Sequence, residues 1–289
     1  MVDRRYTDFY ALHNHLLQKY ANRIVPRPPP KQLMIDSFIE ERRTGLQRWL
    51  RLLSQHPLIS SDELLKTFLT VSTPDQLQQM QNVFNSDPDE FSRFSELKLP
   101  HCDLDQLVIS RETMRTRLNQ VVRLKRFMEQ QAKREMNQSR DFQELSSTIS
   151  AISNEKNFSN FSENFLEISK ESEKVSINQQ LAVTERLVMI IEILTAHSDL
   201  CDRVEKNLST DSTAKNLGEN YENEVKRRKN IALFCVAEET KFVEKYLKLL
   251  PSILLQFSFE ESKGFCKIFE CFKKAIEVES DEINCENGK

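Results

Sequence analysis

The chain has 289 residues, enough for two ordinary domains, and 39% of them are hydrophobic while 29% are charged. It contains 4 glycines, which argues against turn-rich β architecture and favours long amphipathic helices. The net charge of −3 indicates no partner by itself. The six cysteines form no CxxC pair, so they predict neither a zinc site nor a disulfide framework and suit a reducing compartment.

Charge is distributed unevenly along the chain. Residues 1–56 hold ten Lys/Arg against five Asp/Glu, and residues 111–140 hold nine against three. Two interpretations stay open, namely solvated helix faces or two surfaces that contact anions.

The apolar runs are shorter than the ~18–20 residues that span a bilayer, and the chain opens on polar sequence rather than a secretory signal. We therefore expect a soluble intracellular protein.

The first predicted helix begins with Asp8 as its N-cap and runs to about Tyr20. One face of it carries Phe9, Leu12, Leu16 and Leu17. His13 and His15 are two residues apart, so they point to different sides and predict no metal pair.

A proline-rich stretch follows, with Pro26 and Pro28–Pro30 leading to Lys31. These prolines favour an extended backbone, which is either a linker or a rigid loop held against a ligand.

A second helix is predicted over about residues 38–55, capped by Asp36 or Ser37. Its apolar stripe consists of Ile39, Leu46, Trp49, Leu50 and Leu53. His56-Pro57 ends it, and Ser60 or Ser61 is expected to cap a short third helix.

The first unit closes near residues 71–74. We interpret residues 74–102 as a linker with a short amphipathic segment, in which Phe91 and Phe94 either enter a membrane interface or pack on the next domain.

Three long coiled-coil-like helices are predicted after residue 103, over about residues 103–152, 158–208 and 213–277. Apolar residues recur there at spacings of three and four, and helices of that length favour an elongated antiparallel bundle. His197 falls in an apolar seam, which predicts a packed core histidine. Pro251 is expected to kink the third helix without ending it, because the period resumes in phase at Leu254.

Residues 1–73 resemble the later part of a PX domain. The resemblance rests on Arg5-Tyr6 before Asp8-Phe9, on Pro30-Lys31, and on Phe38-Ile39-Glu40-Glu41-Arg42-Arg43. Followed by three long helices, the chain looks like a PX-BAR sorting nexin, and its third helix is similar to that of the sorting nexin 8 branch. The implied fold is all-α as given: the helical remnant of an α+β PX domain in residues 1–73, a BAR-like three-helix domain in 103–279 and a disordered tail in 280–289.

The resemblance implies a site for phosphatidylinositol 3-phosphate. It assigns Arg5 to the 3-phosphate, Tyr6 to a wall for the inositol ring, Lys31 to the bridging phosphate and Arg42 to the 4- and 5-hydroxyls. Arginine suits its two roles because its planar guanidinium donates bidentately. The alternative is that Tyr6 is a core residue and the arginines are solvated. A PX domain begins with three strands that this sequence lacks, so we expect the headgroup site to be weakened or lost.

The basic residues of the long helices are the second expected anionic contact. They are Arg115, Arg123, Lys125, Arg126, Lys133, Arg134, Lys226, Arg227, Arg228 and Lys229. Placed together on a curved homodimer, they are expected to hold anionic lipid at up to ~1 kcal/mol each. The apolar seams predict homodimerisation, because one thin arm cannot cover its own stripes.

The expected function is that of a peripheral adaptor on early endosomes, acting in protein sorting, transport and membrane tubulation, with other sorting nexins and cargo receptors as further partners. The alternative is a coiled-coil scaffold whose PX remnant binds no lipid. The sequence lacks a Gly-rich phosphate loop, a catalytic triad pattern and a metal cluster, so we expect no enzyme, catalytic residue, metal or cofactor. Nucleic-acid binding is not expected, since the basic helix lacks interleaved aromatics.

Overall fold

The computed structural model describes residues 3–30, 36–71, 76–86, 94, 99–152, 156–212 and 219–286, and every regular element within these ranges is helical. The all-α class expected from the sequence is therefore confirmed. The chain divides into two compact units. The first contains residues 1–119 and 189–247, and the second contains residues 120–188 and 248–289.

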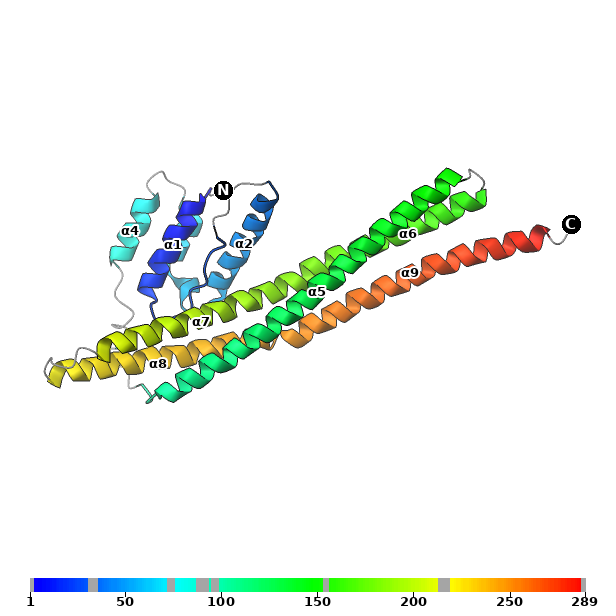
Figure 1. The fold of residues 1–289 in the computed structure, drawn as a ribbon. Coiled ribbons are helices and arrows are strands. Elements are labelled where there is room, and N and C mark those ends of the chain that lie inside the picture. Colours follow the sequence, from blue (N-terminus) through cyan, green and yellow to red (C-terminus); the bar gives the residue numbers. More distant parts are fainter. Residues whose placement is uncertain are drawn as a thin grey trace. The chain divides into compact units, whose positions relative to one another are not determined.

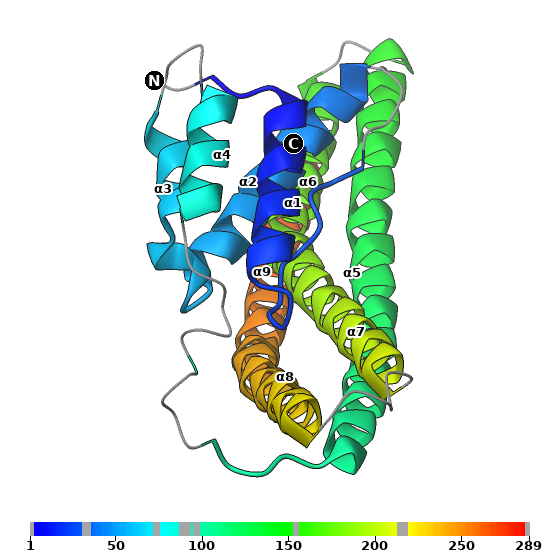
Figure 2. The same ribbon diagram turned by 90° about the vertical axis from the view of Figure 1, so that its left-hand side faces the viewer.

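Short helices build the first part of unit 1 (Figures 1 and 2). They are α1 (Tyr6–Lys19), α2 (Asp36–Gln55), a 3-10 turn (Ile59–Ser61), α3 (Glu63–Thr70) and α4 (Gln76–Ser86). Two caps differ from expectation. Arg5 is the N-cap of α1, and the Asp8 carboxylate lies inside the first turn, where it accepts the Arg5 backbone N–H at 2.8 Å. Asp62 rather than a serine caps α3, because its Oδ1 accepts the Leu64 N–H at 2.7 Å.

The core of these helices forms from apolar residues at helical spacing. Phe9, Leu12 and Leu16 of α1 are buried, as the stripe predicted, and they pack with Trp49 of α2 and Phe68 of α3. The Phe9 ring centroid lies 5.0 Å from that of Phe68 and 6.0 Å from that of Trp49, both edge to face. Burying each such side chain contributes about 1.5–3 kcal/mol, so this cluster holds the short helices together.

The stretch interpreted as a linker contains part of that core. Residues 76–86 form α4, in which Met80 is fully buried and Val83 and Phe84 pack against the same cluster. The signal was weak because Gln and Asn fill most of the other positions. Phe94 is buried and packs on Phe234 with ring centroids 6.3 Å apart, which supports packing over membrane insertion. Phe91 lies outside the described residues.

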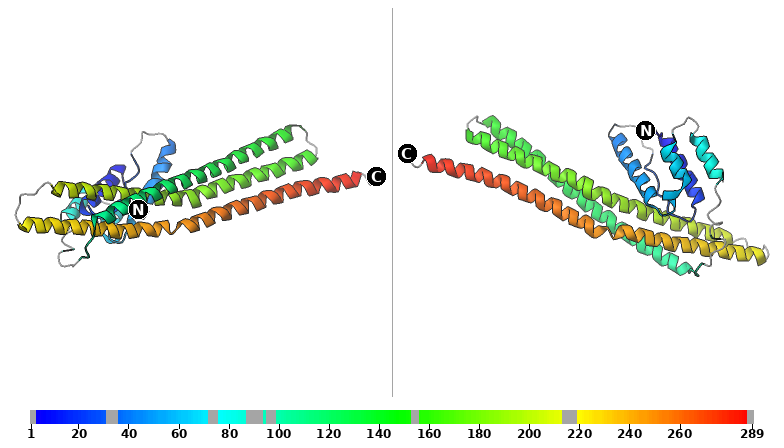
Figure 3. Two further views of the ribbon diagram at one scale, coloured as in Figure 1. Left: turned by 60° about the horizontal axis from the view of Figure 1, so that its bottom comes forward. Right: turned by 180° about the vertical axis from the view of Figure 1, so that it is seen from behind.

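Long helices complete unit 1: the start of α5 (Leu104–Ile152), most of α7 (Glu185–Ser212), and α8 (Glu219–Leu247). Figures 1 and 3 show α7 and α8 side by side. Predicted seam residues such as Met114, Val204 and Val243 are buried. His197 is fully buried and its Nε2 lies 2.8 Å from Thr240 Oγ1. Burial lowers the pKa of His197 to about 4, so it is a neutral core histidine, as expected.

A buried ionic cluster joins the short helices to α8. Glu239, 3% exposed, accepts from Arg23 Nη1 at 3.3 Å and from the Ile24 N–H at 3.3 Å, and its Oε2 lies 3.0 Å from His56 Nε2. The other ring nitrogen, Nδ1, accepts the backbone N–H of Ile59 at 3.3 Å. This acceptor role places the imidazole proton on Nε2, from which it is donated to Glu239. Arg23, His56 and Glu239 therefore each have a polar partner at this junction.

Unit 2 contains the rest of α5, α6 (Lys156–Gln179), a π-helical turn (Gln180–Thr184), the first turn of α7 and α9 (Leu250–Glu286). The α6 helix packs on α9, and a Cβ at Gly264 would clash with Val175 Cγ2, so glycine permits this close approach. Serines, which have small side chains, likewise allow α5 and α6 to approach closely. Ser146 Oγ lies 2.9 Å from Ser162 Oγ there. The expected helix over 158–208 is continuous through α6 and α7.

The third long helix is interrupted at Pro251, so the expectation of an unbroken kinked helix is wrong. The α8 helix ends at Leu247, two turn residues follow, and α9 begins at Leu250. Proline lacks an N–H and its ring collides with the carbonyl four residues earlier, which here belongs to Leu247. The α9 helix runs to Glu286, into the stretch where a disordered tail was expected. Within the described ranges, every helix is too short or too polar to cross a bilayer.

Candidate functional site

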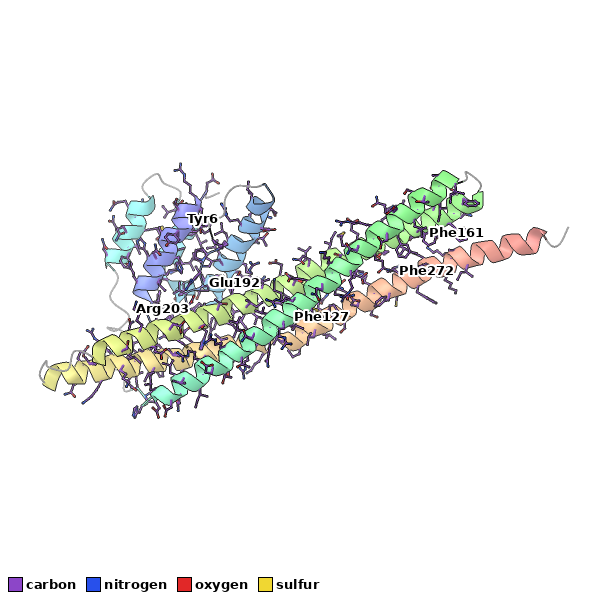
Figure 4. All side chains as sticks on the ribbon, in the orientation of Figure 1. Tyr6, Phe127, Phe161, Glu192, Arg203 and Phe272 are labelled. Carbon is purple, nitrogen blue, oxygen red and sulfur yellow. The ribbon has the colours of Figure 1, made fainter. Side chains whose placement is uncertain are left out.

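The predicted headgroup residues begin at the N-terminal end of α1. Arg5 is exposed and Tyr6 is half-buried at the first helical position (Figure 4). The Tyr6 hydroxyl donates a hydrogen bond of 2.7 Å to the Pro29 carbonyl. The guanidinium carbon of Arg42 lies 5.5 Å from the centre of the Tyr6 ring. The fold thus brings together the first helix, the proline segment and the second helix. Lys31 lies outside the described residues.

The proline segment is clamped rather than loose. Trp49 Nε1 donates to the Pro26 carbonyl at 2.7 Å. A Cβ at position 45 would stand 3.2 Å from Pro29 Cγ, so Gly45 lets α2 approach the segment closely. These contacts favour the rigid-loop interpretation over a linker, because the extended backbone is held on two sides.

Arg4, the neighbour of the predicted phosphate ligand, has a structural role. Its Nε donates to the Phe68 carbonyl at 2.7 Å and its Nη2 to the Val71 carbonyl at 2.5 Å. Its guanidinium also lies over the Phe68 ring, 5.1 Å from the centroid. Arg4 therefore satisfies the last carbonyls of α3 and ties the chain start to that helix. The sequence alone could not assign different roles to Arg4 and Arg5, because they are adjacent residues of the same type.

A cavity of about 910 Å³ adjoins Tyr6. One face of α1 lines it, together with the proline segment and residues 199–206 of α7. Arg27 Nε lies 2.8 Å from Asp199 Oδ2, and Arg203 Nη2 donates to the Arg23 carbonyl at 2.8 Å. Figure 4 places Arg203 on α7. No local pattern signals this cavity, because its walls are far apart in sequence.

The ten predicted membrane-surface residues are exposed except Lys125, which is half-buried. Arg115 and residues 226–229 belong to unit 1, and Arg123 to Arg134 belong to unit 2. Several have protein partners. Lys125 pairs with Glu129 at 2.6 Å, Arg228 with Glu224 at 3.1 Å, and Arg227 donates to the Phe94 carbonyl at 2.9 Å.

Histidines, cysteines and acids are not grouped as metal ligands anywhere in the described ranges. His15 stacks on Phe84, with ring centroids 4.9 Å apart. His13 is buried on a different side of α1 and lines the cavity.

Residues 1–72 match the model of the PX domain family. Sorting nexin-8 of Bos taurus is 25% identical over an alignment that covers 91% of this chain and 70% of that protein. The Homo sapiens protein is 26% identical, with 91% and 69% covered. Sorting nexin MVP1 of Saccharomyces cerevisiae is 43% identical over 76 residues, which is 25% of this chain and 15% of that protein.

The fold is also found in a solved structure, described as the cryo-EM structure of the SNX-BAR Mvp1 tetramer. The TM-score is 0.71 at 20% identity, and the match covers 95% of this chain and 89% of that one. The family resemblance expected from the sequence is thus confirmed: this chain is similar to the PX-BAR sorting nexins, sorting nexin-8 among them, with a PX-family match over residues 1–72 and the fold of an SNX-BAR protein.

Proposed function

We propose that this chain is a phosphoinositide-binding peripheral membrane adaptor. The observation that carries the proposal is the contact of Arg42 with the Tyr6 ring, while the Tyr6 hydroxyl is tied to Pro29. A phosphorylated inositol needs a flat wall and forked cationic donors around it. In this proposal Tyr6 supplies the wall for the inositol ring, and Arg42 supplies the donors for the ring hydroxyls. Arg5 supplies the donor for the 3-phosphate, and Lys31 supplies a cation for the bridging phosphate.

Membrane attachment would combine this headgroup site with the basic residues of the long helices. Each exposed Lys or Arg near an anionic surface contributes about 1 kcal/mol. A dimer would bind one membrane more tightly than either subunit alone, because the second subunit binds in an intramolecular step once the first is attached. Such attachment suits endosomal protein sorting and transport with membrane tubulation, on early endosomes, with other sorting nexins and cargo receptors as partners. The similarity to sorting nexins supports an adaptor rather than an enzyme.

Vesicle binding tests the headgroup site. We expect the chain to bind vesicles containing phosphatidylinositol 3-phosphate more tightly than matched phosphatidylcholine–phosphatidylserine vesicles. Arg5→Ala and Arg42→Ala should each weaken that preference by about 10- to 100-fold, because a hydrogen bond to a charged group contributes about 1.5–3 kcal/mol. Flotation or surface plasmon resonance would measure it.

Arg43→Ala is the matched control, since Arg43 is exposed on the same helix and pairs with Glu40 at 2.5 Å. An equal loss in that variant would point to general charge attraction instead of a site. No preference for the phosphoinositide in the parent chain would support the alternative, a coiled-coil scaffold with a PX remnant that binds no lipid.

Homodimerisation is the second part of the proposal, and exposed aromatics of α9 support it. Phe259, Phe265 and Phe269 are 58%, 60% and 67% exposed. Phe272, labelled in Figure 4, is less exposed at 38%. Its ring centroid lies 6.0 Å from that of Phe142. Large apolar side chains left in water on one helix are typical of an interface with another chain. A second copy is the occupant we propose, because apolar coiled-coil arms commonly pair symmetrically.

Phe269→Asp should convert the dimer to monomer, with a dissociation constant at least about 100-fold weaker, as expected for a central aromatic of an interface. Lys267→Asp places the same side chain about 200° around the helix and should leave the dimer intact. Light scattering after size-exclusion chromatography would measure the mass of both variants. A monomeric parent, or equal masses for the two variants, would contradict the proposed interface.

A further inference from the structure

We infer that the cavity between α1, the proline segment and α7 is a binding groove for a short acidic peptide that carries an aromatic or branched aliphatic side chain. The cavity is distinct from the lipid site in its composition. Of the headgroup residues that the structure describes, Tyr6 lines it, whereas Arg5 and Arg42 do not. Its volume of about 910 Å³ is at the upper end of ordinary ligand pockets.

The length of the groove suits a peptide. Residues from Tyr6 to Leu17 line it along α1, and at about 1.5 Å per residue they span about 16 Å. An extended peptide advances about 3.3 Å per residue, so about five residues match that length.

The walls are held in place before any ligand arrives. Arg203 donates to the carbonyl of Arg23 at 2.8 Å, and Arg27 makes two contacts of 2.8 Å with Asp199. The proline segment is also held by Trp49, whose indole N–H donates to the Pro26 carbonyl. A preformed groove loses little entropy on binding, so contacts along it convert efficiently into affinity.

The charged residues that line the groove include more cations than acids. Burial lowers the pKa of His13, and the nearby Arg27 and Arg203 lower it further, against opposing effects of the Pro26 carbonyl and Asp199. Lys206 adds a third cation to the lining and Asp202 a second acid. The lining thus holds three cations against two acids, and this excess of positive charge favours a ligand that carries a carboxylate.

Apolar side chains also line the groove. Tyr10 is 54% exposed, and Leu17, Val25, Pro28 and Pro30 line the cavity with it. Tyrosine and proline surfaces bind flat or branched apolar side chains at low entropic cost. An apolar side chain and a carboxylate a few residues apart would match both kinds of lining residue, and a short peptide presents that combination.

Selection from a phage-displayed library of random seven-residue peptides on the immobilised full chain tests this inference. The enriched peptides should combine an acidic residue with an aromatic or branched aliphatic one. As fluorescein-labelled synthetic peptides, they should bind the parent chain in anisotropy titrations. Tyr10→Ala and Lys206→Glu should each weaken binding at least 10-fold. Both positions are exposed, so the variants should retain the parent circular dichroism and melting temperature.

Lys66→Glu is the matched control, because Lys66 is exposed on α3 and does not line the cavity. It should leave peptide affinity unchanged, as should Arg5→Ala, which separates this inference from the proposed lipid site. No enrichment, a basic consensus, or full affinity in Tyr10→Ala and Lys206→Glu would overturn the inference. It would also be overturned if these two variants lost phosphatidylinositol 3-phosphate vesicle binding as Arg42→Ala does, since the cavity would then belong to the lipid site.

Discussion

Glu239→Ala is expected to lower the free energy of unfolding of unit 1 by about 3–5 kcal/mol. Removing one partner of a buried ionic cluster leaves the others uncompensated, which costs far more than the net value of the pair. Here Arg23, 7% exposed, would lose its carboxylate, and His56, 2% exposed, would lose the acceptor of its Nε2 proton. The short helices should then separate from α8 at lower denaturant concentration.

Urea titration followed by Trp49 fluorescence measures this effect, because Trp49 is the single tryptophan and is buried among the short helices. Glu244→Ala is the control on the same helix. Glu244 pairs with Arg117 at 3.7 Å and its side chain is 46% exposed, so its loss should cost no more than about 1 kcal/mol. Equal midpoints for the two variants would show that the cluster around Glu239 does not stabilise the junction.

Trp49→Ala is the second large effect, and it should act on stability and binding together. The indole is 1% exposed, packs on Phe9, and donates to the Pro26 carbonyl. Truncating a buried tryptophan costs about 3–5 kcal/mol. Because the same side chain anchors the proline segment, the carbonyl partner of Tyr6 should lose its fixed position, and phosphoinositide binding should fall with stability.

Trp49→Phe separates the two contributions. It retains most of the packing and removes the indole N–H, so it should cost about 1–3 kcal/mol for the unpaired carbonyl and the reduced volume. Thermal unfolding by circular dichroism reports stability, and hydrogen exchange of residues 24–30 reports the anchoring. Unchanged exchange in Trp49→Phe would show that packing alone positions the segment.

Local patterns predicted most of the helical fold. The heptad spacing of Leu107 and Met114 placed the first long helix within one residue of its observed start, because amphipathic periodicity depends on neighbours three and four positions away. The same reasoning placed α1 and α2. It failed at α4, whose apolar residues are few, and at Pro251, where the clash with the preceding turn outweighed a period that resumes in phase.

By itself, the sequence determined the helical class and the burial of His197 in an apolar seam. Tertiary structure alone decided the role of Glu239 and the existence of the cavity at α7. From the sequence, a glutamate on a coiled-coil-like helix is usually predicted to be solvated. The burial of Glu239 depends on Arg23 and His56, which lie more than 180 positions earlier in the chain. Long-range contacts of this kind leave no local periodicity, so only the folded chain reveals them.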